Sequence, residues 1–213
     1  MNRREAIKQS LFTLFYAATF SGIALTGTGC NLWTDIKNWI PVGEAAVNSI
    51  LSVLTANGVI IAAPIQAIVS LIEAGFSALS SAIQEYQSTT PPPVGALAKI
   101  ETAFGDIVNN FSTFVKSLGV SGGLLGIIVG LAQIVFSTIA AFMNMLPAAS
   151  SLKRTVTLSN TLQIGGTTVA VNPKMRTRRA FKKDYNAVLA SAPKVGVTCP
   201  PSAYLPVSFW EHL

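Results

Sequence analysis

A duplication with a period of about sixty residues constrains the fold of this chain more than any other feature of its sequence. Val47 to Val59 aligns with Val108 to Val120, and Ile68 to Ser81 aligns with Ile128 to Ala141. The offsets are 61 and 60 residues, and the difference falls between the blocks, where a connecting turn tolerates a change in length. We therefore expect two copies of one structural unit.

Each copy, at about residues 43–90 and 95–148, has the pattern of a helix, a turn and a second helix. In the second copy, apolar residues recur in steps of three and four, which places them on one helical face. Pro91-Pro92-Pro93 forms a stiff spacer between the copies. The sequence therefore predicts a mainly α fold, a four-helix bundle built from a duplicated helical hairpin. The apolar face comprises Leu97, Ile100, Phe104, Ile107, Phe111, Phe114 and Leu118.

Beyond residue 150 the pattern changes. Thr155 to Val171 is rich in β-branched residues, and Gly165-Gly166 suits a two-residue hairpin turn. Lys174 to Ala192 follows with the pattern of a basic helix, and a Pro-rich tail ends the chain. We expect residues 151–213 to form a small C-terminal β-hairpin plus basic helix, as an appendage to the bundle.

Charge is divided unevenly along the chain. Residues 30–152 hold three Lys against six acidic residues, whereas residues 153–213 hold nine Lys and Arg against two acidic residues. The basic cluster suits anionic lipid headgroups or acidic envelope polysaccharide, and its alternative interpretation is a solvated face that keeps a charge-poor protein soluble. No nucleic acid partner is expected, because no RNA-binding motif or zinc-finger spacing is present. The candidate anion-binding residues are Lys174, Arg176, Arg178, Arg179, Lys182 and Lys183.

The sequence offers no pattern of a catalytic site. His212 is the only histidine, so a Ser-His-Asp site or a His-rich metal centre is out of reach. The Gly-rich stretch at residues 119–126 lacks the Lys-Ser/Thr ending of a phosphate loop. Cys199 has no histidine partner beyond His212. We expect a non-enzymatic protein with no catalytic residue, no metal site and no cofactor.

The first thirty residues have the pattern of an export signal. Arg3, Arg4 and Lys8 precede an uncharged stretch from Leu11 to Gly29. The segment Arg3-Arg4-Glu5-Ala6-Ile7-Lys8 resembles the twin-arginine export motif, and Gly27-Thr28-Gly29-Cys30 resembles the lipobox of bacterial lipoproteins. The resemblance covers residues 1–30 only. It implies export through Arg3 and Arg4, and attachment of a diacylglycerol to Cys30 as the mature N-terminus.

This resemblance implies a lipid-anchored protein of the cell envelope. Asn31 after Cys30, in place of Asp, implies the periplasmic side of the outer membrane in a Gram-negative cell. Two other fates stay open: an uncleaved anchor long enough to span a bilayer, or cleavage elsewhere that leaves Cys30 free to pair with Cys199. The expected organisation is a signal peptide at 1–29, a lipid-attachment and linker segment at 30–42, the bundle at 43–150 and the appendage at 151–213.

The surroundings of the second copy have two interpretations. Leu124 to Leu146 is long enough to cross a membrane, and Gly122, Gly126 and Gly130 recur at a spacing that marks close packing of membrane helices. The equivalent helix of the first copy carries Glu73 on a polar stripe, however, and a charge at the bilayer centre costs about 3 kcal/mol on insertion scales.

We therefore expect a bundle in water or at a membrane surface, acting as an exported, lipid-anchored, non-enzymatic scaffold or interaction protein of the cell envelope. Its partners would be membrane lipid through Cys30, and a second copy or another envelope protein. One alternative is a membrane-integral helical subunit or pore that uses residues 124–146. A second alternative is a hydrophobic-ligand carrier with a cavity between the hairpins.

Overall fold

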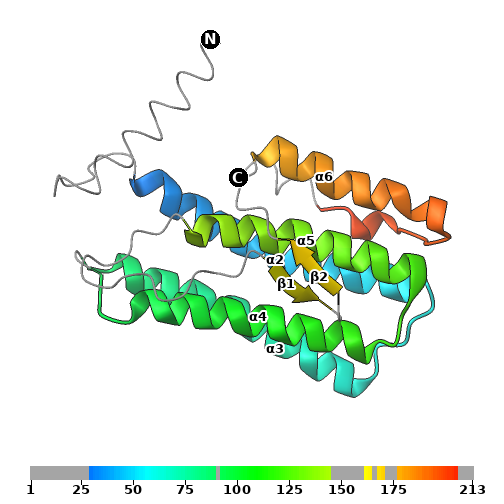
Figure 1. The fold of residues 1–213 in the computed structure, drawn as a ribbon, viewed down its shortest axis with the longest axis horizontal. Helices are drawn as coiled ribbons and strands as arrows, with labels where there is room; N and C mark the ends of the chain where they lie inside the picture. The colour runs from blue at the N-terminus through cyan, green and yellow to red at the C-terminus, as the bar shows by residue number, and fades with distance from the viewer. Residues whose placement is uncertain (1–28, 90–91, 145–160, 165–166, 171–176, 206–213) are drawn as a thin grey trace, which may run out of the picture. The chain divides into compact units, whose positions relative to one another are not determined.

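The computed structural model describes residues 29–89, 92–144, 161–164, 167–170 and 177–205. The chain divides into two units, Met1–Asp35 and Ile36–Leu213, and the second unit contains the core. The prediction of a mainly α fold is confirmed. The helices are α2 (Gly29–Ala56), α3 (Ala63–Gln87), α4 (Ala96–Ser117), α5 (Gly122–Asn144) and α6 (Arg178–Ser191), followed by the short 3₁₀ helices η1 (Ala192–Val195) and η2 (Pro201–Ala203) (Figure 1).

The apolar face predicted for the first helix of the second copy lies in the core. Its five central side chains are at most 1% exposed, and Leu97 and Leu118 at its ends are half-buried. Phe111 of α4 packs edge-on against Phe136 of α5, with ring centroids 5.2 Å apart. The steps of three and four therefore identified the buried side of α4 correctly.

Gly58 and Gly119, which are equivalent in the predicted duplication, both have a left-handed backbone just after a helix. Their φ angles are +77° and +62°, a conformation that glycine adopts without a steric cost. Beyond α2, the N–H of Val59 donates to the carbonyl oxygen of Leu54 at 3.0 Å and closes the turn. Both copies thus begin with a helix that a glycine ends.

The segment at 30–42, predicted as a linker, is instead part of α2. The helix begins at Gly29 rather than Gly43 and continues through Pro41. A proline inside a helix removes a backbone hydrogen bond and costs about 3 kcal/mol. Trp39, Ile40 and Val42 on either side of Pro41 are buried in the core, and their packing offsets this cost.

One pair of neighbouring helices joins the two copies. α3 and α4 run antiparallel and side by side (Figure 1). Gly75 of α3 permits the approach, because a Cβ atom there would lie 2.7 Å from Cγ1 of Ile107 in α4. The sequence predicted pairing within each hairpin, but it carried no sign that the small residues of α3 face α4.

Two short strands follow the bundle. β1 (Thr161–Ile164) pairs antiparallel with β2 (Thr167–Ala170), with Thr161 opposite Ala170 and Ile164 opposite Thr167. The turn at Gly165-Gly166 lies outside the described residues, so the predicted hairpin stays a prediction.

α6 begins at Arg178, four positions after the predicted start at Lys174. Thr177 caps the helix, because its side-chain oxygen accepts a hydrogen bond from the N–H of Ala180 at 3.2 Å. The region predicted as an appendage belongs to the same compact unit as the bundle.

α5 is buried on nearly all sides. From Ile127 to Met143, every residue apart from Gly130 and Gln133 is at most 9% exposed. α4 contacts one side, and α6, η1 and β2 contact others. Of the predicted glycine stripe, Gly130 lies against Val188 of α6, whereas a Cβ atom at Gly122 or Gly126 would meet open space.

Candidate functional site

The structure brings three of the six predicted anion-binding residues together at the start of α6. Arg179, Lys182 and Lys183 are exposed there, and Arg178 is the first residue of the helix. Lys174 and Arg176 lie outside the described residues, as do Arg3 and Arg4, and Cys30 falls within α2. Helix N-termini carry a partial positive charge, so the start of α6 combines a basic cluster with a favourable dipole for anions.

The opposite side of α6 attaches it to the bundle. Phe181, Tyr185 and Leu189 follow at steps of four and are completely buried. The ring of Phe181 meets that of Trp39 from α2 edge-on at 4.6 Å, and Trp39 in turn lies 5.9 Å from the ring of Phe142 in α5. Because this side is fixed in the core, the cations of α6 are held on the outer side.

A buried chain of hydrogen bonds links α6, α2 and the tail. The hydroxyl of Tyr185 donates to Oγ of Ser49 at 2.7 Å, and Ser49 donates to the carbonyl oxygen of Ala203. Burial raises the pKa of the Tyr185 phenol well above its ordinary value, so the group stays neutral and serves as a donor. The arrangement holds the tail against the bundle.

A second polar contact lies at the end of α2. Nδ2 of Asn57 donates to the carbonyl oxygen of Thr198 at 2.8 Å, and the N–H of Thr198 donates back to Oδ1 of Asn57 at 2.9 Å. Cys199 beside it is a half-buried free thiol, and burial raises the pKa of that thiol. The raised pKa favours the neutral thiol, which is a weaker nucleophile than the thiolate.

Sequence analysis did not identify Ser49 or Asn57. Their position could have identified them. Ser49 is a polar residue on the otherwise apolar side of α2 that includes Ile50 and Val53, and Asn57 continues that side just beyond the end of the helix. A polar group on a buried face needs a partner, but the partners are far away in the sequence.

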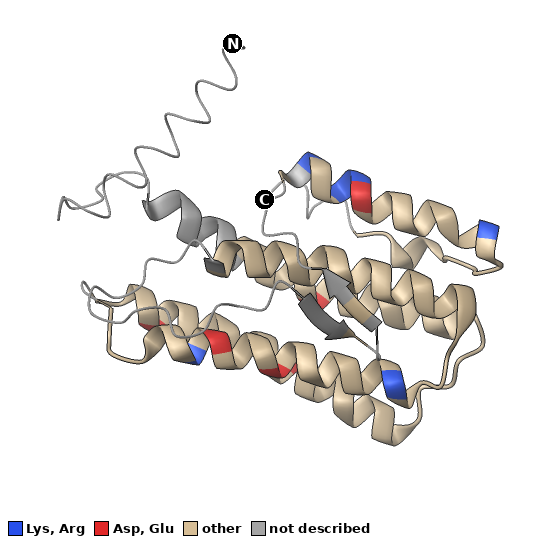
Figure 2. Ribbon diagram, viewed as in Figure 1, with Lys and Arg blue, Asp and Glu red and all other residues tan. Residues whose placement is uncertain are grey.

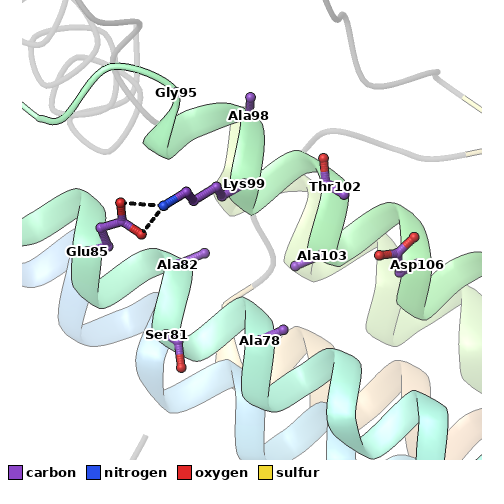
Figure 3. Close-up of a pocket in the computed structure, with 10 residues that line it drawn as sticks. All are labelled: Ala78, Ser81, Ala82, Glu85, Gly95, Ala98, Lys99, Thr102, Ala103 and Asp106. Atoms are coloured by element: carbon purple, nitrogen blue, oxygen red, sulfur yellow. Dashed lines mark hydrogen bonds and ion pairs between the residues drawn. The ribbon is translucent and has the colours of Figure 1, made fainter.

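A depression of about 510 Å³ lies between α3 and α4 (Figure 3). Small side chains such as Ala78, Ala82 and Ala103 line it, and Asp106 stands at one end. Nζ of Lys99 lies 2.6 Å from Oε1 of Glu85 at the other end, in an exposed ion pair of the kind that contributes about 1 kcal/mol or less. The depression opens to solvent between the copies, and the predicted carrier cavity stays a prediction.

Glu44 of α2 lies within electrostatic reach of Glu73 in α3. Partial burial and the nearby carboxylate of Glu73 raise the pKa of Glu44. Within the described ranges, no group of three or more His, Cys, Asp and Glu residues is arranged to hold a metal ion.

Comparisons of this chain with protein-family models, with curated proteins and with solved structures find no match. The chemistry of its own residues therefore directs the functional proposal. Among the residues that the structure describes, three helical segments are long and apolar enough to cross a membrane, at Asn38–Ala56, Ala63–Gln87 and Gly122–Met143. This property makes membrane association a central question for the fold.

Proposed function

We propose that this protein is an exported, lipid-anchored, non-enzymatic scaffold or interaction protein of the cell envelope, whose bundle folds outside the bilayer. The burial of α5 carries the proposal. This helix is the most apolar of the three candidate spans, yet the protein itself covers it. Covering a helix with protein yields a large hydrophobic gain in water, whereas lipid chains already provide an apolar environment.

The elements that pack over α5, namely α6, η1 and β2, form its cover, and they add a second argument. Val188 of α6 lies against Gly130 near the middle of α5, and Lys182 and Lys183 are less than two turns away on α6. If α5 spanned a bilayer, these cations would lie at membrane depth, at a cost of up to about 2.5–3.5 kcal/mol each, the value on insertion scales for the bilayer centre. Both observations support a bundle that stands in water or at a membrane surface.

The exposed cations of α6 are the proposed contact for an anionic envelope component. A cationic helix start matches the phosphates of anionic lipid and the acidic groups of envelope polysaccharide. Replacing Arg178, Arg179, Lys182 and Lys183 together with Gln should weaken binding to acidic glycan and to anionic liposomes, most strongly at low salt. Unchanged binding of both probes would remove this contact from the proposal.

The lipid anchor has a direct test. The intact mass of the membrane-extracted protein should correspond to a chain that begins at Cys30 and carries acyl groups. The variant Cys30→Ser, expressed from residue 30 onward, should then be released by carbonate at high pH. An unmodified precursor mass would contradict the anchor.

The three candidate spans favour a second function, that of a membrane-integral subunit or pore. α3 supports it most, because only 33% of its candidate span is buried. If the Cys30→Ser variant without the signal stays in membranes after carbonate extraction, this second function replaces the first.

A further inference from the structure

Three apolar turns meet at one end of the bundle, and we call this end the apolar tip. It comprises residues 59–65 between α2 and α3, residues 118–125 between α4 and α5, and residues 193–195 of η1 (Figure 1). Gly123 lies against Val195, and Asn57 is hydrogen-bonded to Thr198, so η1 adjoins both turns. The antiparallel pairing of α3 with α4 brings the first two turns to the same end.

The side chains of the apolar tip are unusual for surface turns. Ile60 is 83% exposed and Val195 is 51% exposed. Residues 59–65 contain no polar side chain, and residues 118–125 contain only one, Ser121. The half-exposed members are Val59, Ile61, Ile65, Leu118, Val120, Leu124 and Leu125.

Backbone groups in the first turn bond within the turn. The N–H of Ala62 donates to the carbonyl oxygen of Ile60 at 3.2 Å, and the carbonyl oxygen of Ala62 accepts from the N–H of Ile65 and of Gln66. The side-chain amide of Gln66 donates to the carbonyl oxygen of Ile61 at 3.2 Å. Such internal bonding lowers the cost of moving a turn out of water, because fewer polar groups lose hydration unpaired.

Charge at the tip has one sign. Lys116 at the end of α4 and Lys194 in η1 are both exposed and flank the apolar residues. No acidic residue occurs in the described ranges 55–72, 107–130 and 192–205. The coloured ribbon likewise carries blue but no red at this end (Figure 2). Flanking lysines complement an anionic surface, and their apolar stems allow them to lie at its edge.

We propose that the apolar tip inserts into the interfacial layer of an anionic lipid bilayer. Ile60, Val195 and the half-exposed side chains would enter the boundary between headgroups and acyl chains, while Lys116 and Lys194 contact phosphate groups. Protruding turns with a cationic rim fit a soft anionic layer better than a flat protein face. The contact does not require a lipid on Cys30, and it lies at the opposite end of α6 from Arg179.

Co-sedimentation with vesicles tests the proposal. The chain from residue 30 onward, carrying Cys30→Ser, is mixed with vesicles of phosphatidylglycerol and phosphatidylcholine, and with vesicles of phosphatidylcholine alone. Ile60→Glu should lower the partition coefficient on the anionic vesicles roughly tenfold or more. The substitution removes an apolar side chain that would enter the bilayer, and it adds a negative charge that anionic lipid repels. Lys116→Gln with Lys194→Gln should lower it by roughly fivefold or more and weaken the preference for anionic vesicles.

Val94→Glu is the matched control. Val94 is 92% exposed in the spacer between α3 and α4, at the other end of the bundle, so this variant should bind within about twofold of the parent. Equal losses for Ile60→Glu and Val94→Glu would overturn the proposal, as would unchanged binding of Ile60→Glu. Sedimentation of the protein alone tests whether a second copy covers the tip instead of lipid. A dimer that Ile60→Glu dissociates and Val94→Glu does not, together with no binding to vesicles, would overturn the proposal in favour of self-association.

An environment-sensitive dye provides an independent readout. Ile60→Cys and Val94→Cys are each labelled in the chain that carries Cys30→Ser and Cys199→Ser, so that the dye has one attachment site. Anionic vesicles should shift the emission of the dye at position 60 to shorter wavelength and leave the dye at position 94 unchanged. The proposal fails if both dyes shift alike or if neither shifts.

Discussion

α3 and α5 occupy equivalent places in the predicted duplication, yet the structure treats them differently. Leu71 of α3 is 54% exposed, whereas its counterpart Leu131 of α5 is fully buried. Ser81 is exposed where its counterpart Ala141 is buried. Both helices contact α4, but only α5 also lies under α6, η1 and β2. In the part of the chain that the structure describes, α6, η1 and β2 pack over α5, whereas no such contact covers α3.

The difference between α3 and α5 shows which residue types accompany an exposed helix and a covered one. α3 keeps Glu73 and a polar stripe on its outer side, as a helix at a water boundary does. α5 has Gln133 in place of the acidic residue and carries no charge. An uncharged, apolar helix therefore need not indicate a membrane span when another part of the same chain packs over it.

The largest expected effect on stability comes from a substitution at Leu131, with the equivalent Leu71 as the comparison. Leu131→Ala should lower the free energy of unfolding by about 2–5 kcal/mol, because it opens a cavity in a packed core. Leu71→Ala should change it by about 0.5 kcal/mol or less. Urea unfolding followed by circular dichroism measures both. Similar losses at the two positions would mean that the outer side of α3 is also covered in solution.

The fit of the cover depends on small residues in α5. A Cβ atom at Gly123 would lie 2.7 Å from the carbonyl oxygen of Val195, so Gly123→Ala should destabilise the fold by about 1–3 kcal/mol. Gly126 faces open space within the same helix, and Gly126→Ala should stabilise it by about 0.5–1 kcal/mol. Thermal unfolding distinguishes the two. A stabilising Gly123→Ala would show that η1 does not rest on α5.

The hydrogen bonds of Tyr185 and Ser49 hold the cover in place. Tyr185→Phe leaves the buried oxygen of Ser49 without its donor and should cost about 1–2 kcal/mol. The double variant with Ser49→Ala should cost less than the sum of the single variants, because the two groups act as a pair. Tyr204→Phe, at a partly exposed phenol, is the control and should be nearly neutral. Additive losses in a double-mutant cycle would contradict the pairing.

The smallest expected effect concerns Glu44 of α2 and its neighbour Glu73 of α3. The raised pKa of Glu44 means that the folded state holds this proton more tightly than the unfolded chain, so stability falls as pH rises through that pKa. Glu44→Gln should therefore stabilise the protein near neutral pH by about 0.5 kcal/mol, and its advantage should disappear well below pH 4.5.

Glu73→Gln tests the cause, because it removes the neighbouring charge that helps to raise the pKa of Glu44. It should give a smaller gain with the same dependence on pH. Unfolding curves at several pH values check both variants. A gain that persists unchanged in acid would show that the carboxylate charge is not responsible.

Sequence reasoning predicted the helices well where their faces were unequal. The apolar steps through Phe104 and Phe111 identified the buried side of α4, and Glu73 lies on the exposed side of α3 as the polar stripe indicated. It misplaced the start of α2, because Pro41 favours a helix end locally and only packing around Trp39 offsets that preference. It also missed Ser49 and Asn57, whose partners Ala203 and Thr198 are far along the chain.

By itself, the sequence determined the local features of this protein. Periodicity reports which side of a helix is apolar, and Gly58 and Gly119 mark positions where a helix can end. Only the tertiary structure decided what surrounds α5, because a helix that is apolar on every side has no periodic face to indicate its neighbour. Whether protein or lipid covers such a helix depends on long-range packing, here on the contacts of Val188 and Val195 with its glycines.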